Sequence, residues 1–270
     1  MDLHLLGDEM TMLESQHTGK VQRTDQAAEG EGDAPVQFQT GDLVLIHECA
    51  GIGCCSGVTR TVSKLVECMT ESRFSHIGIV VTDKSHLGID TIGSQHTTSE
   101  SVGPWVWESG EENGVYGVQL TPLARFTDDD SLSIHVRHLE CTRDAGFYEA
   151  LTDSWATTQG RPYDMNLIDW LAAWARQSGA GVYRLPPDSF WRKRSRFWCS
   201  ALVAFVYAQL TLLASDVEWT LVSPREFSHF EGRELDFQHC SLSPETLWSK
   251  KSQQDTAAAA FAEAAGKVLR

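Results

Sequence analysis

Residues 197–213 read FWCSALVAFVYAQLTLL and contain the longest apolar run of the chain. Nearly every residue after Cys199 is compatible with a helix, so the sequence predicts a buried helix over 200–213. Cys199 then lies at the helix N-terminus, where free backbone N–H groups and the macrodipole favour a thiolate, the stronger nucleophile. The N–H groups of Cys199 and Ser200 are also placed to hold the oxyanion of a tetrahedral intermediate.

A base for such a thiol occurs upstream, where residues 74–80 read FSHIGIV. His76 precedes a predicted buried strand, and a histidine there titrates near neutrality, so it can accept a thiol proton and return it to a leaving group. Glu108, in the segment VWES at 106–109, ends the next predicted strand, where pairing would bring it beside His76 to orient the imidazole. Each residue also has an ordinary interpretation: a small buried cysteine, a surface histidine, and a solvated acid in an acidic loop over 108–112.

The rest of the chain alternates between strand and helix patterns, which predicts an α+β protein with helices around a small, mainly antiparallel sheet. A long polar loop is expected over 84–104. The expected strands are 42–46, 77–82, 105–108, 115–120 and 132–138, and the expected helices are 56–70, 145–158, 165–177 and 200–213.

Three regions are predicted along the chain. Residues 1–38 are polar and without any period, which predicts a flexible tail. Residues 39–250 are expected to form the catalytic domain. Residues 251–270 are rich in Ala, which favours a C-terminal helix or tail.

Composition narrows the class of function. The 270 residues carry 22 Lys and Arg against 37 Asp and Glu, a formal charge of −15, which argues against nucleic acid as a partner. Seven cysteines without framework spacing favour free thiols in a reducing compartment. The N-terminal residues lack the basic and apolar regions of a secretory signal, and no apolar run reaches the ~18 residues of a spanning helix. We therefore expect a cytoplasmic protein.

Five short segments, taken in chain order, resemble the circularly permuted papain-like hydrolases of the NlpC superfamily, in particular the YiiX/YaeF-like amidase group. They are GDLVLI at 41–46, SHIGIV at 75–80, VWES at 106–109, GRPYD at 160–164 and WCSALV at 198–203. The resemblance implies a small antiparallel barrel-like sheet packed against a helix that bears the nucleophile. It implies Cys199 as nucleophile, His76 as general base and acid, and Glu108 as the orienting residue, acting on an amide or ester through a thioester. No cofactor is expected, because nucleophile, base and oxyanion donors all come from the chain.

A rival nucleophile lies at Cys54 and Cys55, where CCSGV at 54–58 is similar to the motif of the unpermuted enzymes. In those enzymes the Gly-Asp strand follows the nucleophile helix, whereas here residues 41–42 come first and only about twenty residues separate Cys55 from His76. We therefore prefer Cys199. The nearby glycines lack the Lys-Ser/Thr of a phosphate-binding loop, and the scattered histidines predict no metal site.

For the substrate, the sequence predicts only a chemical class. Tyr163 and Trp198 are expected to line the cleft, while Asp164 is more simply the N-cap of the following helix. Residues 184–198 hold five cations and four aromatic residues, which suits contact with an anionic membrane, although a solvated loop with inward-packed rings is the alternative. The expected function is a cysteine hydrolase or acyltransferase acting on a peptide amide or an acyl lipid. The alternative is a catalytically silent lipid or acyl-peptide binding module on the same fold.

Overall fold

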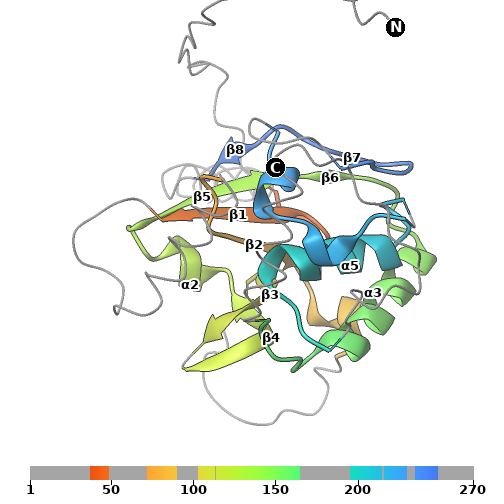
Figure 1. Ribbon diagram of the computed structural model, residues 1–270, viewed down its shortest axis with the longest axis horizontal. Helices are drawn as coiled ribbons and strands as arrows, with labels where there is room; N and C mark the ends of the chain where they lie inside the picture. The colour runs from red at the N-terminus through yellow and green to blue at the C-terminus, as the bar shows by residue number, and fades with distance from the viewer. Residues whose placement is uncertain are drawn as a thin grey trace, which may run out of the picture. The chain divides into compact units, whose positions relative to one another are not determined.

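The computed structural model describes seven stretches of the chain, all within one compact unit over residues 34–270 (Figure 1). They are residues 37–48, 72–89, 103–112, 114–164, 195–214, 216–229 and 235–248. Most of the predicted N-terminal tail, the predicted helices over 56–70 and 165–177, and residues 251–270 lie outside them. Within the described stretches no helix is long and apolar enough to cross a membrane.

A six-stranded sheet forms the centre of this unit, in the order β4-β3-β2-β1-β5-β8, and every pairing in it is antiparallel. Together with the helices, this sheet confirms the predicted α+β class. The strands are β1 (Leu43–Glu48), β2 (His76–Val81), β3 (Trp105–Glu112), β4 (Val115–Pro122), β5 (Leu132–Arg137) and β8 (Thr246–Leu247). A separate two-stranded ladder pairs β6 (Leu139–Glu140) with β7 (Ser241–Leu242).

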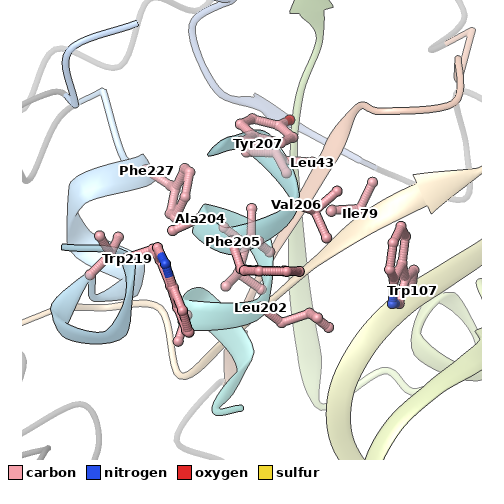
Figure 2. Close-up of a cluster of buried hydrophobic side chains, with 14 of the residues drawn as sticks. Leu43, Ile79, Trp107, Leu202, Ala204, Phe205, Val206, Tyr207, Trp219 and Phe227 are labelled. Atoms are coloured by element: carbon pink, nitrogen blue, oxygen red, sulfur yellow. The ribbon is translucent and has the colours of Figure 1, made fainter. Parts of the chain in front are cut away.

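Both faces of the sheet are covered, which explains why its central strands read as continuous apolar runs rather than as alternating ones. Leu43 and Leu45 of β1 belong to the main core cluster, whereas Val44 between them belongs to a smaller second cluster. The main cluster is built on α5 (Cys199–Gln209), whose side chains pack against β1, β2 and β3 and against the turn over Trp219–Leu221 (Figure 2). The helix α3 (Ala145–Thr158) adds Phe147 and Leu151 to the same cluster.

The boundaries of several elements differ from the predicted ones. β3 continues to Glu112, so the predicted acidic loop over 108–112 is wrong: these residues pair with β4, down to Glu112 opposite Val115. α5 ends at Gln209 rather than at 213, and Thr211 follows with a left-handed φ of 57°. The predicted loop over 84–104 begins with a 3₁₀ turn, Lys84–Leu87, which buries Leu87. Short elements that we did not predict include α2 (Ala124–Thr127) and the 3₁₀ turn Pro224–Phe227.

Candidate functional site

The structure brings His76 and Glu108 into direct contact. His76 Nε2 lies 2.5 Å from Glu108 Oε2, and the two side chains are 19% and 4% exposed. β2 and β3 pair with Ile79 opposite Trp107, a register that sets His76 opposite Gly110 and Glu108 one diagonal step away on the same face. Cross-strand pairing therefore joins a residue at the start of β2 to one in the middle of β3.

Glu108 is held from its other side by β4. Thr121 Oγ1 donates a hydrogen bond to Glu108 Oε1, and Gln119 Nε2 lies 3.4 Å from the same oxygen. Burial alone would raise the Glu108 pKa, but the hydrogen bonds and charge of His76, with Thr121 and Gln119, lower it below its ordinary value. Glu108 is therefore a buried carboxylate with defined partners on both oxygens.

Cys199 is the third group at this point. Its side chain interacts with His76, because a hydrogen bond to Cys199 and the Cys199 charge are both among the causes of the shifted His76 pKa. Burial by itself would lower the His76 pKa, but the bonds to Cys199 and Glu108 and their negative charges raise it to about 10. With a pKa of about 10, the imidazole of His76 carries its proton at neutral pH.

Two glycines leave room for the His76–Glu108 contact. A Cβ on Gly110 would lie 2.8 Å from Glu108 Oε2 and 3.4 Å from His76 Cε1. A Cβ on Gly78, which the same register sets opposite Glu108, would lie 2.3 Å from a methyl group of Val106. Neither position tolerates a side chain without displacing its neighbours, so both glycines belong to the support of the site.

The N-terminus of α5 is fixed by contacts with the residue two positions before Cys199. Ser109 Oγ on β3 donates to the Phe197 carbonyl oxygen at 2.7 Å, and the Asp164 amide donates to the same oxygen at 3.0 Å. Trp198 occupies the N-cap position in an extended conformation, with no side-chain cap bond to the first turn. The Ser200 hydroxyl is used elsewhere, since it donates to the Val222 carbonyl at 2.7 Å, so only the Ser200 backbone is open to the predicted oxyanion role.

Residues 160–164, which follow α3 in the chain, pair with β4 on one side and with Phe197, just before α5, on the other. The Val118 amide donates to the Arg161 carbonyl at 2.8 Å, Gly117 bridges Pro162, and Tyr163 bridges Phe197. This approach requires a glycine at 117, because a Cβ there would lie 2.5 Å from the Arg161 carbonyl oxygen. The segment that contains Tyr163 thus acts as a short extra strand between β4 and Phe197, two residues before α5.

The predicted cleft residues lie close to the three groups. Burial, and then the negative charges of Cys199, Asp164 and Glu108, raise the pKa of the Tyr163 phenol, which places it within electrostatic reach of the site. Trp198 is only 9% exposed. A role for either in substrate binding stays a prediction, as does the membrane contact of 184–198, of which only residues 195–198 are described.

An aromatic side chain that sequence reasoning missed lies over the imidazole. Phe126, on α2, stacks with His76 at a centroid distance of 6.2 Å and an interplanar angle of 25°. It also packs against the smaller core cluster, which includes Val80 of β2 and Val106 of β3. The ring restricts the movement of the imidazole on that side and shields it from water.

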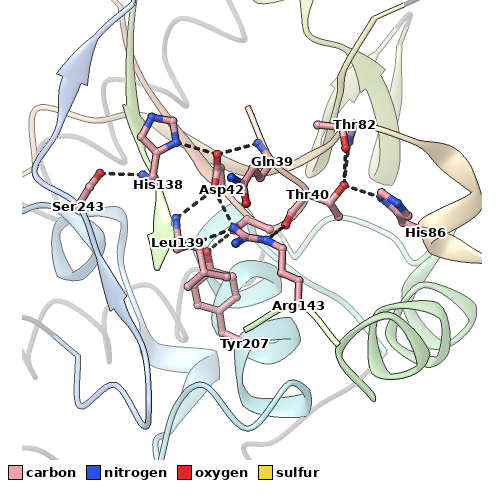
Figure 3. Close-up of polar contacts among 11 residues, drawn as sticks. Gln39, Thr40, Asp42, Thr82, His86, His138, Leu139, Arg143, Tyr207 and Ser243 are labelled. Atoms are coloured by element: carbon pink, nitrogen blue, oxygen red, sulfur yellow. Dashed lines mark hydrogen bonds and ion pairs between the residues drawn. The ribbon is translucent and has the colours of Figure 1, made fainter. Parts of the chain in front are cut away.

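A second polar network anchors Gly41 and Asp42, which directly precede β1 (Figure 3). Asp42, buried at 1% exposure, accepts bonds from His138 Nδ1 at 2.8 Å and Arg143 Nη2 at 3.1 Å, and the bond from His138 raises the His138 pKa. Tyr207, near the C-terminus of α5, donates to the Gly41 carbonyl at 2.7 Å. The predicted GDLVLI motif therefore holds the helix rather than entering the chemistry.

Two further expectations from the sequence concern the rival nucleophile and metal binding. Cys54 and Cys55 lie outside the described residues. Within the described part of the chain, no three His, Cys, Asp or Glu side chains are grouped as a metal ion would need.

Comparisons with known proteins identify no family for the chain. No family model matches the sequence, and no curated protein matches it at a significant level. The crystal structure of the metalloprotein YiiX from Escherichia coli O157:H7 aligns with 80% of this chain and 98% of its own, at 19% identity and a TM-score of 0.39. A similarity with so low a TM-score carries no argument about function, so the function of this chain has to be inferred from its own residues.

Proposed function

We propose that this protein is a cysteine-dependent hydrolase or acyltransferase that cleaves an amide or ester bond through a thioester. Cys199 is the nucleophile, His76 the general base and acid, and Glu108 the residue that orients His76. The observation that carries the proposal is the 2.5 Å contact of His76 with the buried Glu108 carboxylate, together with the contribution of Cys199 to the raised pKa of His76. A nucleophile, a base and an orienting group in this sequence of contacts are the signature of covalent catalysis.

The first half of the reaction forms the thioester. The Cys199 thiolate attacks the carbonyl carbon, the C=O π electrons move to oxygen, and the oxyanion receives hydrogen bonds from the backbone N–H groups of Cys199 and Ser200 at the α5 N-terminus. When the intermediate collapses, the C–N or C–O bond breaks and His76 gives its proton to the leaving group. The acyl group remains on Cys199, and His76 is left neutral.

The second half releases the acyl group. Neutral His76 takes a proton from water, or from an acceptor alcohol or amine, as that molecule attacks the thioester carbon. Collapse expels the Cys199 thiolate, and the proton stays on His76, which restores the starting pair. Whether water or another acceptor attacks decides between a hydrolase and an acyltransferase.

The order of the motifs supports a permuted papain-like arrangement, with the strand of His76 before the helix of Cys199 in the chain. The substrate class under this proposal is a peptide amide or an acyl lipid. The burial of Phe197 and Trp198, two of the four aromatic residues in 184–198, favours a packing role for these two rings over membrane contact.

The test is the rate at which iodoacetamide alkylates each cysteine as a function of pH, read by peptide mass spectrometry for the wild type and for His76→Ala. Cys141 and Cys240 are internal controls in the same digest, because burial raises the pKa of both and keeps them slow near neutral pH. We expect Cys199 to react fastest well below pH 8 and to lose that advantage in His76→Ala.

Turnover of a panel of peptide amides and acyl esters, with Cys199→Ser as the blank, then identifies the substrate class. Fastest labelling at Cys54 or Cys55 would show that the nucleophile has been assigned to the wrong helix. Labelling without any preferred cysteine, and no turnover of any panel member, would favour the binding module.

A further inference from the structure

Cys141 and Cys240 form a second pair of thiols that the proposed reaction does not use. Cys141 directly follows β6, and Cys240 directly precedes β7, the two strands of the small antiparallel ladder (Figure 1). Leu139 pairs with Leu242 and Glu140 with Ser241. One further step in this register, beyond the last pair of the ladder, would set Cys141 opposite Cys240, although about a hundred residues separate them in the chain.

The two side chains lie on the same face of the ladder. Leu139 and Leu242 are 2% and 8% exposed, whereas Glu140 and Ser241 are exposed, so alternate positions point toward the core. Cys141 and Cys240 continue the core-facing set, and both pack, half-buried, against the main hydrophobic cluster.

The spacing suits a covalent bond. The Ser243 amide donates to the His138 carbonyl at 2.9 Å, which makes this pair a hydrogen-bonded one, and alternation makes the Cys141–Cys240 pair non-hydrogen-bonded. Cα atoms in such a pair are ~4.5 Å apart, within the ~4.4–6.8 Å that disulfides span. Burial and then the negative charge of Cys141 raise the pKa of Cys240 to about 11, as expected of thiols that lie close together.

We propose that Cys141 and Cys240 are a reversible dithiol site, which a small-molecule disulfide such as oxidised glutathione converts to an intrachain cross-strand disulfide. One protein thiolate attacks a sulfur of the small disulfide, forms a mixed disulfide and releases one small thiol. The second protein thiolate attacks the protein-side sulfur and releases the other. Two electrons pass from the cysteines to the small disulfide, and the two thiol protons end on the two released thiols.

The raised pKa values of the two thiols determine how fast the disulfide forms and how easily it is reduced. Because the pKa of each thiol is raised, few molecules hold a thiolate at neutral pH, so oxidation is slow there and accelerates in base. The same raised pKa makes each sulfur a poor leaving group, so the disulfide, once formed, resists reduction by small thiols. The bond would close a loop that contains α3, residues 160–164 and all of α5, and would therefore restrain the segment that carries Cys199.

The experiment uses the full chain incubated with oxidised glutathione at pH 7 and pH 9, followed by blocking of free thiols and peptide mapping without reductant. We expect a peptide pair joined through Cys141 and Cys240, formed roughly tenfold or more faster at pH 9, and a thermal unfolding midpoint that rises by several degrees and returns after reduction. Cys240→Ser should stop at a glutathione adduct on Cys141. Cys199→Ser, the matched control, should keep the cross-link.

Stable glutathione adducts on both cysteines of one molecule, cross-links from either residue to another cysteine, or no reaction at pH 9 in the folded chain would each overturn the proposal. The wild-type peptide map decides among these outcomes even if a serine variant folds poorly. The result does not depend on whether Cys199 is catalytic.

Discussion

Replacing Gly110 with alanine tests the contact between His76 and Glu108 while both of these residues stay unchanged in the sequence. The added Cβ would lie 2.8 Å from Glu108 Oε2, closer than folded proteins allow, so the carboxylate must move. Thr121 and Gln119 hold its other oxygen, and the bond to His76 is the one that must lengthen. A hydrogen bond to a charged group is worth ~1.5–3 kcal/mol, and ~1.4 kcal/mol is a factor of ten. We therefore expect the Cys199 alkylation rate to fall roughly ten- to a hundredfold.

The assay is the second-order rate of iodoacetamide alkylation at Cys199 at about pH 6.5, with a thermal melt of each variant to confirm folding. Gly103→Ala is the matched control, because a Cβ at Gly103 meets no atom within 4 Å. Glu108→Gln keeps the size of the side chain and removes its charge. A Gly110→Ala rate equal to the wild type, with a slow Glu108→Gln, would show that Gly110 does not position the pair. Wild-type rates in both would refute the role of Glu108.

The same contacts lead to three further predictions. Ser109→Ala removes the bond to the Phe197 carbonyl and should lower the free energy of unfolding in urea by about 0.5–1.5 kcal/mol while also slowing Cys199 alkylation. Glu108, with its lowered pKa, stabilises the fold above its ordinary value of 4.5 and less as pH falls. His76, raised from 6.5 to about 10, stabilises fully below 6.5 and less as pH rises toward 10. The stability difference between wild type and Glu108→Gln in urea melts should therefore be largest between about pH 4.5 and 6.5 and shrink on both sides. Asp42→Ala leaves partly buried cationic donors without their acceptor and should cost about 3 kcal/mol or more, seen as a lower thermal midpoint.

The sequence was sufficient to predict the elements that depend on local pattern. Continuous apolar runs predicted β1, β2 and α5 because these segments are buried on all sides, and burial requires apolar residues whatever the partner. The pairing of Glu108 with Gln119 was also within reach. Residues 113–114 read Asn-Gly, the strongest short hairpin signal, and a two-residue turn there sets Glu112 opposite Val115 and Glu108 opposite Gln119.

The contacts that position the proposed nucleophile could not be predicted in this way. Ser109 and Phe197 are 88 positions apart, and a serine in a strand gives no sign of which distant carbonyl it will bond. Gly78 and Gly110 look like ordinary strand glycines until the neighbouring side chains are known. Phe126 stacks on His76 only because α2 follows β4 at that edge of the smaller cluster. Such contacts depend on tertiary packing, which no local window contains.

The arrangement of these contacts explains how a thiol and an imidazole more than a hundred residues apart can keep one geometry. α5 is tied to the sheet at two points. Phe197, before its first residue, bonds to Ser109 of β3, and Tyr207, near its last, bonds to Gly41, two residues before β1. β2, which carries His76, lies between β1 and β3 in the sheet. Because one tie is made to β3 and the other to the residues that lead into β1, a shift of the helix along the sheet must break at least one buried hydrogen bond. The sheet therefore fixes Cys199 relative to His76, and under the proposed mechanism this is the preorganisation that a proton transfer between them would require.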